Sequence, residues 1–534
     1  MLHVRNLSVS FGSAEVLEGI SLDLNHGEVL IVTGPNGSGK STLLKCIAGE
    51  IEYSDGSIDL DKSVSYILLE QETPKAEGSA IQFLLKGFPV IYKVYNEMKT
   101  AAPESSAYAD AVTAFADGGG YELQSELVRI AAGFGFSEGD LDRGLVTFSE
   151  GEKKILAFVR LLAGNANLML LDEPMNHLDI SMRVFAEKMI ISQKKKGRCF
   201  LIVSHDRIFT DRIADRTLYL QREKGVTVNG GISQMLSHLE LELDAGKKKA
   251  ADIERKIKKL EAEVAARAVW AGRKERSARK QRKLYDGAYL ASRAARMAKR
   301  SKAAETRRER SVTELENTKP FIEKRLNLSF DTYEVSKRLI VKAQGLSKGY
   351  EKPVIENVSL SVTTRDRIAL IGPNGSGKTT IMRCLLTEIE PDKGIIHLSK
   401  YVKYLYLPQE IEKFFRRDIL LDNLTREGLD TSRVRQFLGA AKLSAEQVLR
   451  PVSTLSRGEL MRAAIVSAII DKVDFLFLDE PTNHLDIESL IVLDNLLNSF
   501  PGGVLFISHD RSFIAQHAEK VYRLSGNNLK PCSL

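Results

Sequence analysis

The sequence predicts an α/β protein in which one domain occurs twice, with a long basic helical segment between the two copies. Three observations support this prediction. A glycine-rich motif at residues 34–42 recurs almost unchanged at 372–380, each time after an apolar strand and before a helix-like run. An apolar strand ending in two acids also occurs in both halves. Positive charge is concentrated at residues 247–325, where 26 basic and 11 acidic residues give a net charge of +15, against +7 for the whole chain.

Composition limits the possible classes of protein. A chain of 534 residues can form two to four domains, and 43% apolar with 28% charged residues is typical of a soluble globular protein. No uncharged apolar run approaches the roughly 18 to 20 residues of a membrane helix, so we expect a cytoplasmic protein without a membrane partner. Cys46, Cys199, Cys384 and Cys532 lie far apart, which argues against a zinc or iron–sulfur site.

The repeated motif has the P-loop pattern, in which backbone N–H groups of a glycine-rich turn and a helix N-terminus bind phosphates. The expected nucleotide-binding residues are Gly34, Pro35, Asn36, Gly37, Ser38, Gly39, Lys40, Ser41 and Thr42, and then Gly372, Pro373, Asn374, Gly375, Ser376, Gly377, Lys378, Thr379 and Thr380. We expect Lys40 and Lys378 to reach the β- and γ-phosphates of ATP. Ser41 and Thr379 would hold Mg²⁺.

The paired acids follow LMLL at 168–171 and FLFL at 475–478. Such runs predict buried parallel strands that deliver a carboxylate to the sheet edge where ligands bind. We expect Asp172 and Asp479 to bind Mg²⁺ through water. Glu173 and Glu480 are the candidate general bases that polarise the attacking water.

Four further motifs occur twice in the same order, and together the set resembles tandem ABC nucleotide-binding domains. FSEGE at 148–152 and LSRGE at 455–459 resemble the ABC signature, and NHLD at 176–179 and 483–486 resembles the D-loop. Gln71 and Gln409 resemble the Q-loop glutamines, which contact the metal. His205 and His509, both in SHDR, resemble the switch histidine.

This resemblance implies that the two domains face each other head to tail within one monomer. Ser456 and Gly458 would then complete the site of Lys40, and Ser149 and Gly151 the site of Lys378. Phe11 and Tyr350 are placed to stack on adenine, although core positions are an equal alternative. The first copy departs from the pattern at Glu150 and Met175, so we expect two competent sites with unequal rates.

The spacing of equivalent motifs places 31 extra residues in the first copy, within roughly 73–139. We expect a surface helical hairpin, an arm at about 78–128, that either contacts a partner or is a simple loop extension. The predicted domains are a first nucleotide-binding domain at 1–233, a helical hairpin linker at 234–323, and a second nucleotide-binding domain at 324–534.

The linker is expected to begin near Gln234 with Ser233 as its N-cap and to turn near Gly287. Ile253, Ile257, Leu260 and Val264 repeat at helical spacing and form its apolar seam. The predicted RNA-binding residues are Arg293, Arg296, Lys299 and Arg300 on the outer face and Tyr285, Tyr289 and Leu290 near the turn. Such a rod fits a polyanionic cavity, and a solvated coiled-coil spacer is the alternative.

Two such domains joined by a basic hairpin resemble the ABC-F family of ribosome-associated ATPases. The resemblance implies binding at the ribosomal exit site, with large-subunit rRNA and the P-site tRNA as partners. The linker tip resembles that of the antibiotic-resistance branch, which implies protection against drugs at the peptidyl-transferase centre. A housekeeping translation factor of the same family, or the tandem ATPase subunit of a sugar importer, are the alternatives.

Overall fold

The computed structural model describes residues 1–12, 14–69, 78–176, 178–221, 225–281, 335–350, 352–425, 430–483 and 485–532. The chain forms two compact units. The larger contains Met1–Met235 and Leu326–Leu534, and the smaller contains Leu236–Arg325. None of the helices in the described ranges is long and apolar enough to cross a membrane.

The first copy of the repeated domain, called here the first cassette, contains two sheets. Its elements are β1 (Leu2–Phe11), β2 (Ala14–Leu24), β3 (Val29–Thr33), α1 (Lys40–Ile47), β4 (Asp55–Leu60), β5 (Tyr66–Leu69), α2 (Ala80–Leu85), α3 (Pro89–Thr100), α4 (Ser106–Asp117), α5 (Gly120–Gly133), α6 (Glu138–Leu141), η1 (Leu145–Thr147), α7 (Glu150–Ala163), β6 (Leu168–Asp172), α8 (Ile180–Lys195), β7 (Cys199–Val203), α9 (Arg207–Ile213), β8 (Arg216–Leu220) and β9 (Gly225–Asn229). An antiparallel sheet has the order β2-β1-β4, and a larger sheet has the order β5-β6-β7-β3-β8-β9.

The second cassette repeats this architecture. Its elements are β10 (Leu339–Gly349), β11 (Pro353–Thr363), β12 (Arg367–Ile371), α12 (Lys378–Leu385), β13 (Lys393–Leu398), β14 (Tyr404–Leu407), η2 (Ile411–Phe414), α13 (Leu420–Leu424), α14 (Thr431–Ala440), α15 (Ala445–Val448), η3 (Val452–Thr454), α16 (Arg457–Ile470), β15 (Phe475–Asp479), α17 (Ile487–Ser499), β16 (Gly503–Ile507), α18 (Arg511–His517), β17 (Lys520–Ser525) and β18 (Asn528–Cys532). Its sheets have the orders β11-β10-β13 and β14-β15-β16-β12-β17-β18.

The apolar runs that the sequence predicts as buried strands form the centre of each large sheet. Every residue of β3, β6 and β7 is buried, as is every residue of β15 and β16. These strands are parallel, and only the edge strands β9 and β18 run antiparallel. A strand buried on both faces must be apolar throughout, which explains the continuous rather than alternating pattern.

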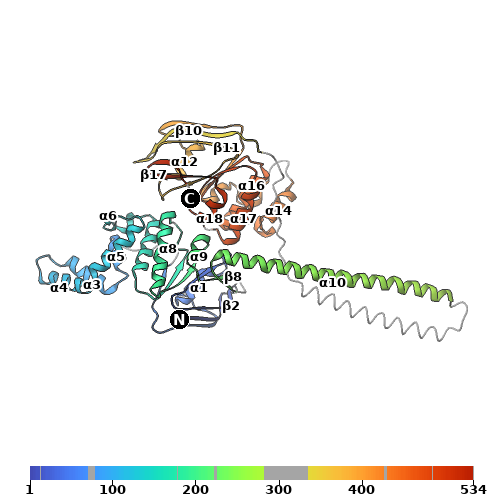
Figure 1. Ribbon diagram of the computed structural model, residues 1–534, viewed down its shortest axis with the longest axis horizontal. Helices are drawn as coiled ribbons and strands as arrows, with labels where there is room; N and C mark the ends of the chain where they lie inside the picture. Colours follow the sequence, from blue (N-terminus) through green and yellow to red (C-terminus); the bar gives the residue numbers. More distant parts are fainter. Residues whose placement is uncertain are drawn as a thin grey trace. The chain divides into compact units, whose positions relative to one another are not determined.

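The extra residues of the first cassette include α3 and α4, which pack against each other as a helical hairpin (Figure 1). The ring of Phe115 lies 5.0 Å from that of Tyr121 and 6.0 Å from that of Tyr95, and it is buried. In the second cassette the described helices between β14 and the signature segment are α13, α14 and α15. These contacts join the hairpin to α5 and to the hydrophobic core of the first cassette.

The first limb of the linker is α10 (Ile232–Gln281), a helix of 50 residues. At 1.5 Å per residue it is about 75 Å long. The expected turn near Gly287 and the return limb lie outside the described residues.

The prediction of Ser233 as the helix N-cap is wrong, because α10 begins one residue earlier, at Ile232. The cap comes instead from a residue remote in sequence. The backbone N–H of Ser233 donates to Asp211 Oδ1 at 2.9 Å, and the Ser233 hydroxyl donates to the other carboxylate oxygen. A carboxylate at a helix N-terminus satisfies free N–H groups and complements the helix dipole.

We expect Asp211→Ala to loosen the start of α10, because the N–H group of Ser233 in the first turn loses its hydrogen-bond acceptor. Loss of a capping side chain costs about 1 kcal/mol. Amide hydrogen exchange of residues 232–236 should accelerate, whereas Asp110→Ala, at an exposed position on α4, should leave it unchanged. Equal protection in the parent and in Asp211→Ala would show that the carboxylate does not cap this helix.

Candidate active site

The two P-loops have the same backbone geometry. Each begins at a glycine with positive φ, 151° at Gly34 and 158° at Gly372. A Cβ atom there would lie 2.2 Å from the Leu220 carbonyl oxygen or 2.6 Å from that of Leu524. No side chain fits this approach without moving the adjacent strand, so the glycine is required at both positions.

The P-loop lysines begin helices α1 and α12 and are buried. Lys40 Nζ donates to the carbonyl oxygens of Gly34 and Pro35 at 2.9 and 2.8 Å. Lys378 Nζ makes the equivalent bonds at 3.0 and 2.8 Å. Burial lowers the pKa of both lysines, because the charged form loses its hydration.

Each loop also holds a buried hydroxyl without a hydrogen-bond partner among the described residues, Ser38 Oγ and Ser376 Oγ. A buried polar atom that lacks a partner costs free energy unless a ligand supplies one. Together with the glycine turns and the buried ammonium groups, these hydroxyls fit the phosphate groups of a nucleotide.

The two acids after β6 and β15 lie beside the P-loops. Glu173 and Glu480 adopt the left-handed conformation, with φ of 47° and 50°, which is uncommon outside glycine. The backbone N–H of each donates to the neighbouring strand, to Val203 O and Ile507 O, both at 3.0 Å. The chain thus turns sharply after the strand, and this conformation is held by the sheet itself.

Each of these glutamates faces the histidine of its own SHDR motif. His205 Nε2 lies 3.5 Å from Glu173 Oε1, and His509 Nε2 lies 3.3 Å from Glu480 Oε1. His205 Nδ1 is also 3.1 Å from the hydroxyl of Thr33, at the end of β3. The structure therefore brings together the acid and the histidine of each cassette.

Burial controls the ionisation of these groups. It raises the pKa of Glu173 to about 8, with the neighbouring carboxylate of Asp172 adding to the effect, and it raises the pKa of Glu480 to about 7. Burial likewise lowers the pKa of both histidines, His205 and His509, to about 3. A carboxyl group with its pKa near neutrality suits a general base, and the histidines are neutral at that pH.

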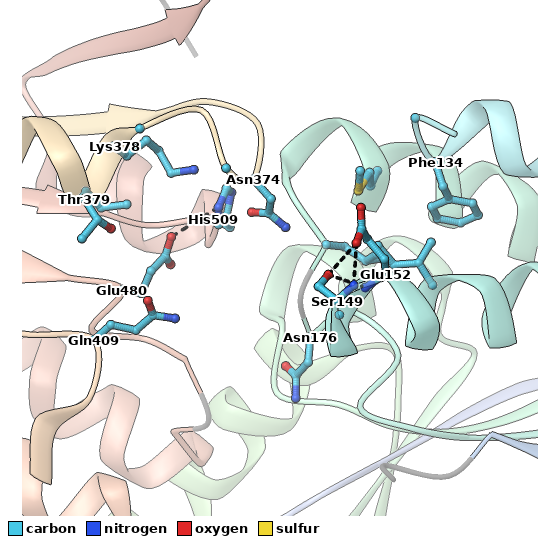
Figure 2. Close-up of a pocket in the computed structure, with 18 of the residues that line it drawn as sticks. Phe134, Ser149, Glu152, Asn176, Asn374, Lys378, Thr379, Gln409, Glu480 and His509 are labelled. Carbon is cyan, nitrogen blue, oxygen red and sulfur yellow. Dashed lines mark hydrogen bonds and ion pairs between the residues drawn. The ribbon is translucent and has the colours of Figure 1, made fainter. Parts of the chain in front are cut away.

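A cavity of about 800 Å³ contains the second P-loop (Figure 2). Lys378, Thr379, Gln409, Glu480 and His509 line one side of it. Tyr350 also lines this cavity. Residues of the first cassette line the other side, among them Ser149, Glu152 and Asn176. Gly151 lines the same cavity.

The serine of the first signature is positioned by its own helix. Ser149 is the N-cap of α7 and forms a capping box with Glu152, whose Oε2 accepts from the Ser149 hydroxyl at 2.7 Å and from its N–H at 2.8 Å. The helix N-terminus beside this serine offers free N–H groups and the positive end of the dipole. This arrangement can bind a phosphate group held by Lys378.

A second cavity, of about 430 Å³, contains the first P-loop with Lys40, Ser41, Thr42, Asp172 and Glu173. Its other side is lined from the second cassette by Thr482, Asn483 and Leu485, and Ser456 and Gly458 are not among the described residues that line it. The backbone N–H of Asn36 donates to Asp486 Oδ2 at 2.8 Å. The two sites therefore differ in size and in the groups that face each P-loop.

The remaining predicted site residues either lie outside the described ranges or differ in whether they line a cavity. Gln71 lies outside the described residues, as do Tyr285, Tyr289, Leu290, Arg293, Arg296, Lys299 and Arg300. Phe11 is 53% exposed and does not line the cavity of its own cassette, whereas the other predicted adenine partner, Tyr350, lines the cavity of Lys378. Sequence reasoning did not select Thr33, Asn176 or Asp486, although the two NHLD motifs contain the last two.

A metal ion would need oxygen ligands at this site. Within the described ranges no group of three or more His, Cys, Asp or Glu side chains could hold a metal alone. Thr379 Oγ1 donates to Asp479 Oδ1 at 3.3 Å, and Asp479 Oδ2 is buried without a described partner. A hydroxyl and a carboxylate together with phosphate oxygens are the ligands that Mg²⁺ prefers.

The raised pKa values predict a pH-dependent stability for the nucleotide-free protein. Glu173 keeps its proton up to about pH 8 in the folded state, whereas an unfolded glutamate loses it near 4.5. Stability therefore falls as the pH rises between these values. We expect Glu173→Gln, which cannot ionise, to match the parent in melting temperature at pH 5 and to exceed it at pH 8. Each kcal/mol of unfolding free energy that the variant gains over the parent should raise its melting temperature by about 2–4 °C.

Glu122→Gln is the matched control for this measurement, since Glu122 is exposed on α5 and its replacement should not alter the pH profile. Glu480→Gln should behave like Glu173→Gln, except that the pH range over which the parent loses stability ends near pH 7, the pKa of Glu480. Melting curves of parent and Glu173→Gln that stay parallel from pH 5 to pH 8 would refute the raised pKa.

Comparison with known proteins agrees with this geometry. The family described as ABC transporter matches residues 17–176 and 355–483, which contain both P-loops and both pairs of acids. The putative ATP-binding protein YdiF of Bacillus subtilis is 34% identical over 99% of this chain and 81% of its own length. ATP-binding protein Uup of Caulobacter vibrioides is 30% identical over 98% of this chain and 77% of its own length.

Solved structures show the same fold. The structure of an RNase-L inhibitor superposes with a TM-score of 0.62 at 19% identity, covering 99% of this chain and 91% of that one. A second structure, a model of ribosome-bound archaeal Pelota and ABCE1, has a TM-score of 0.57 at 19% identity over 99% of this chain and 78% of that one. The predicted α/β fold with two tandem nucleotide-binding domains is thereby confirmed.

The family match covers both cassettes, and the relatives align along nearly the whole chain. These findings assign the chain to a family. The protein binds and hydrolyses ATP, and it belongs to the ABC family, among its tandem, ABC-F-like ATP-binding proteins.

Proposed function

We propose that this protein is a ribosome-binding ATPase that enters the exit site with ATP bound and extends its linker toward the peptidyl-transferase centre. There it protects the ribosome from antibiotics, with large-subunit rRNA and the P-site tRNA as its contacts. A ribosomal partner places this activity in the cytoplasm. The protein acts as a monomer, because one chain supplies both cassettes.

The observation that carries this proposal is the charge of the linker. Six basic side chains of α10 are exposed within one short stretch: Lys248, Lys249, Arg255, Lys256, Lys258 and Lys259. The acids exposed over the same stretch are Asp252 and Glu254, and Asp252 lies 3.7 Å from Arg255. A helix about 75 Å long with this excess of positive charge favours a polyanionic partner.

The fold supports the same partner. In one of the solved structures with this fold, ABCE1 is bound to a ribosome together with Pelota. That finding concerns ABCE1, and a likeness at 19% identity concerns the fold alone. The basic linker supplies the independent reason to extend the ribosomal partner to this chain.

Within the ATP sites we propose that Glu173 and Glu480 act as general bases toward the attacking water. Their raised pKa values and their neutral histidine neighbours suit that role. Mg²⁺ would be held by Ser41 and Asp172 in one site and by Thr379 and Asp479 in the other, with Gln71 and Gln409 near it. The metal would neutralise charge on the phosphate groups during hydrolysis.

Two alternatives share the same ATP sites. A translation factor that acts on stalled or initiating ribosomes would use the same basic linker, so only the effect on drug-treated ribosomes separates it from a protection protein. The ATPase subunit of a sugar importer would need a membrane partner and gives the exposed lysines of α10 no role. Co-sedimentation with ribosomes distinguishes this last alternative from the proposal.

We expect Glu173→Gln combined with Glu480→Gln to bind ATP with parental affinity and to lose most of its hydrolysis, since glutamine keeps the shape of the side chain but cannot accept the proton. Loss of a general base costs about 10²–10⁴-fold in rate. Steady-state phosphate release and binding of a fluorescent ATP analogue measure the two effects separately. Parental turnover in the double variant would exclude both residues as bases.

We expect ribosome binding to weaken steeply with salt, by a log–log slope of roughly −0.7 to −0.9 for each phosphate neutralised. Arg293→Gln, Arg296→Gln and Arg300→Gln together should flatten that slope and abolish protection in a drug-sensitive bacterium tested against lincosamides, pleuromutilins and streptogramin A compounds. The control removes three exposed lysines elsewhere, Lys62, Lys188 and Lys472, and should change neither.

Binding without drug protection would favour the translation factor. An unchanged salt slope in the arginine variant would instead favour the solvated spacer as the role of the linker.

A further inference from the structure

The antiparallel sheets of the two cassettes have the same strand arrangement but differ in charge along one cross-strand row. In the first cassette, the central strand places His3 between Asp23 of β2 and Asp59 of β4, and His3 Nδ1 lies 2.6 Å from Asp23 Oδ1. In the second cassette, the equivalent row places Lys342 between Ser361 and His397. Two carboxylates of the first cassette are thus replaced by a hydroxyl and an imidazole, and the central histidine by a lysine.

The turns after β4 and β13, at 61–65 and 399–403, also differ in their side chains, although both make equivalent hydrogen bonds at their ends. The N–H of Asp61 donates to Met1 O at 3.1 Å, and the equivalent N–H of Ser399 donates to Ile340 O at 2.8 Å. Four residues further on, the N–H of Ser65 donates to an Asn167 oxygen at 3.2 Å.

The second turn repeats this bond, from the N–H of Lys403 to Asp474 Oδ2 at 3.1 Å. The bonds at the two ends of the turn are thus equivalent, and the exposed side chains between them differ. Lys62, Ser63 and Ser65 in the first turn correspond to Lys400, Tyr401 and Lys403 in the second.

Hydrogen bonds from Arg338 hold the turn around Tyr401, and the Tyr401 ring does not pack against the rest of the described protein. Arg338 Nη1 donates to the Tyr401 carbonyl oxygen at 3.4 Å, and Arg338 Nη2 lies 3.2 Å from Asp474 Oδ2. The side chain of Tyr401 is nevertheless 89% exposed. Because Ser63 occupies the same place in the same turn of the first cassette, the backbone does not require an aromatic residue there.

We propose that the second cassette binds single-stranded RNA on this surface, which we call the basic face. The basic face consists of Lys342, Lys393, His397, Lys400, Tyr401 and Lys403, all exposed. Its lysines contact phosphate groups, and the Tyr401 ring stacks on an unpaired base. The proposal rests on the proposed function in one respect, that the ribosome supplies the RNA.

The chemistry of the face selects this partner. The exposed ring of Tyr401, flanked by lysines on a turn that Arg338 contacts, matches the alternation of base and phosphate along an RNA strand. Insertion into a membrane would need a broader apolar surface than Tyr401 forms with the exposed Ile395 and Tyr404. The basic linker belongs to the same chain, so both positively charged surfaces would engage one polyanion.

The test uses the full-length protein and a labelled single-stranded RNA oligonucleotide, with binding measured by fluorescence anisotropy at several salt concentrations. We expect Tyr401→Ser, which installs the residue of the first turn, to weaken binding about tenfold without changing the salt slope. Lys400→Ser should weaken binding and reduce the slope by about 0.7. Lys62→Ser removes the same charge at the equivalent position of the first cassette and should have no effect.

Melting temperature and ATP hydrolysis should stay at parental values in all three variants, since none of these side chains lines either ATP cavity. Equal effects of Lys400→Ser and Lys62→Ser would overturn the proposal, as would parental binding by Tyr401→Ser or no RNA binding by the parent. Binding to vesicles of anionic lipid or to an acidic peptide that depends on Tyr401, without such binding to RNA, would also overturn it.

Ribosome pelleting separates this inference from the proposed function. Parental protein that binds the oligonucleotide through Tyr401 but does not pellet with ribosomes would support the basic face and refute the ribosomal partner. If the parent and Tyr401→Ser pellet with ribosomes equally well and also bind the oligonucleotide equally well, the ribosomal partner would be supported and the basic face refuted.

Discussion

Two adjacent carboxyl groups buried at the end of one strand are the constraint around which each ATP site is built. Burial alone would favour their neutral forms, and each Asp raises the pKa of the Glu beside it. The P-loop lysine opposes both effects in both cassettes. The left-handed turn and the strand end place the two carboxyl groups beside the buried lysine, whose charge partly offsets the effect of their burial.

The local parts of this arrangement could be predicted from the sequence. A P-loop and an apolar strand that ends in two acids each occupy fewer than ten consecutive residues, so spacing along the chain determines their geometry. Contacts between segments far apart could not be predicted in the same way. Asp211 caps α10 in place of the predicted Ser233, and Asp486 meets the first P-loop from the second cassette. No local pattern identifies such partners.

The register of the sheets supplied information that the sequence alone does not contain. His3, Asp23 and Asp59 are widely spaced in the chain, and only the pairing of β1 with β2 and β4 places them in one row. The acidic character of that row, and the basic character of its counterpart, therefore appear only in the folded protein. A count of charged residues along the chain locates the positive excess in the linker. It does not show that the antiparallel sheets of the two cassettes differ in charge.

Comparison of equivalent positions in the two cassettes distinguishes residues that the backbone conformation requires from residues that a surface uses for binding. Where the two cassettes make the same hydrogen bonds with different side chains, the difference cannot be required for folding, because the other copy folds without it. Ser63 and Tyr401 are the clearest pair, since both lie on a turn whose two ends make equivalent hydrogen bonds. Burial separates such positions from Thr482, which bonds Ser508 at 3.1 Å in the core where the first cassette has the buried Met175. The exposed differences therefore point to binding, and the buried ones to packing around the two unequal ATP sites.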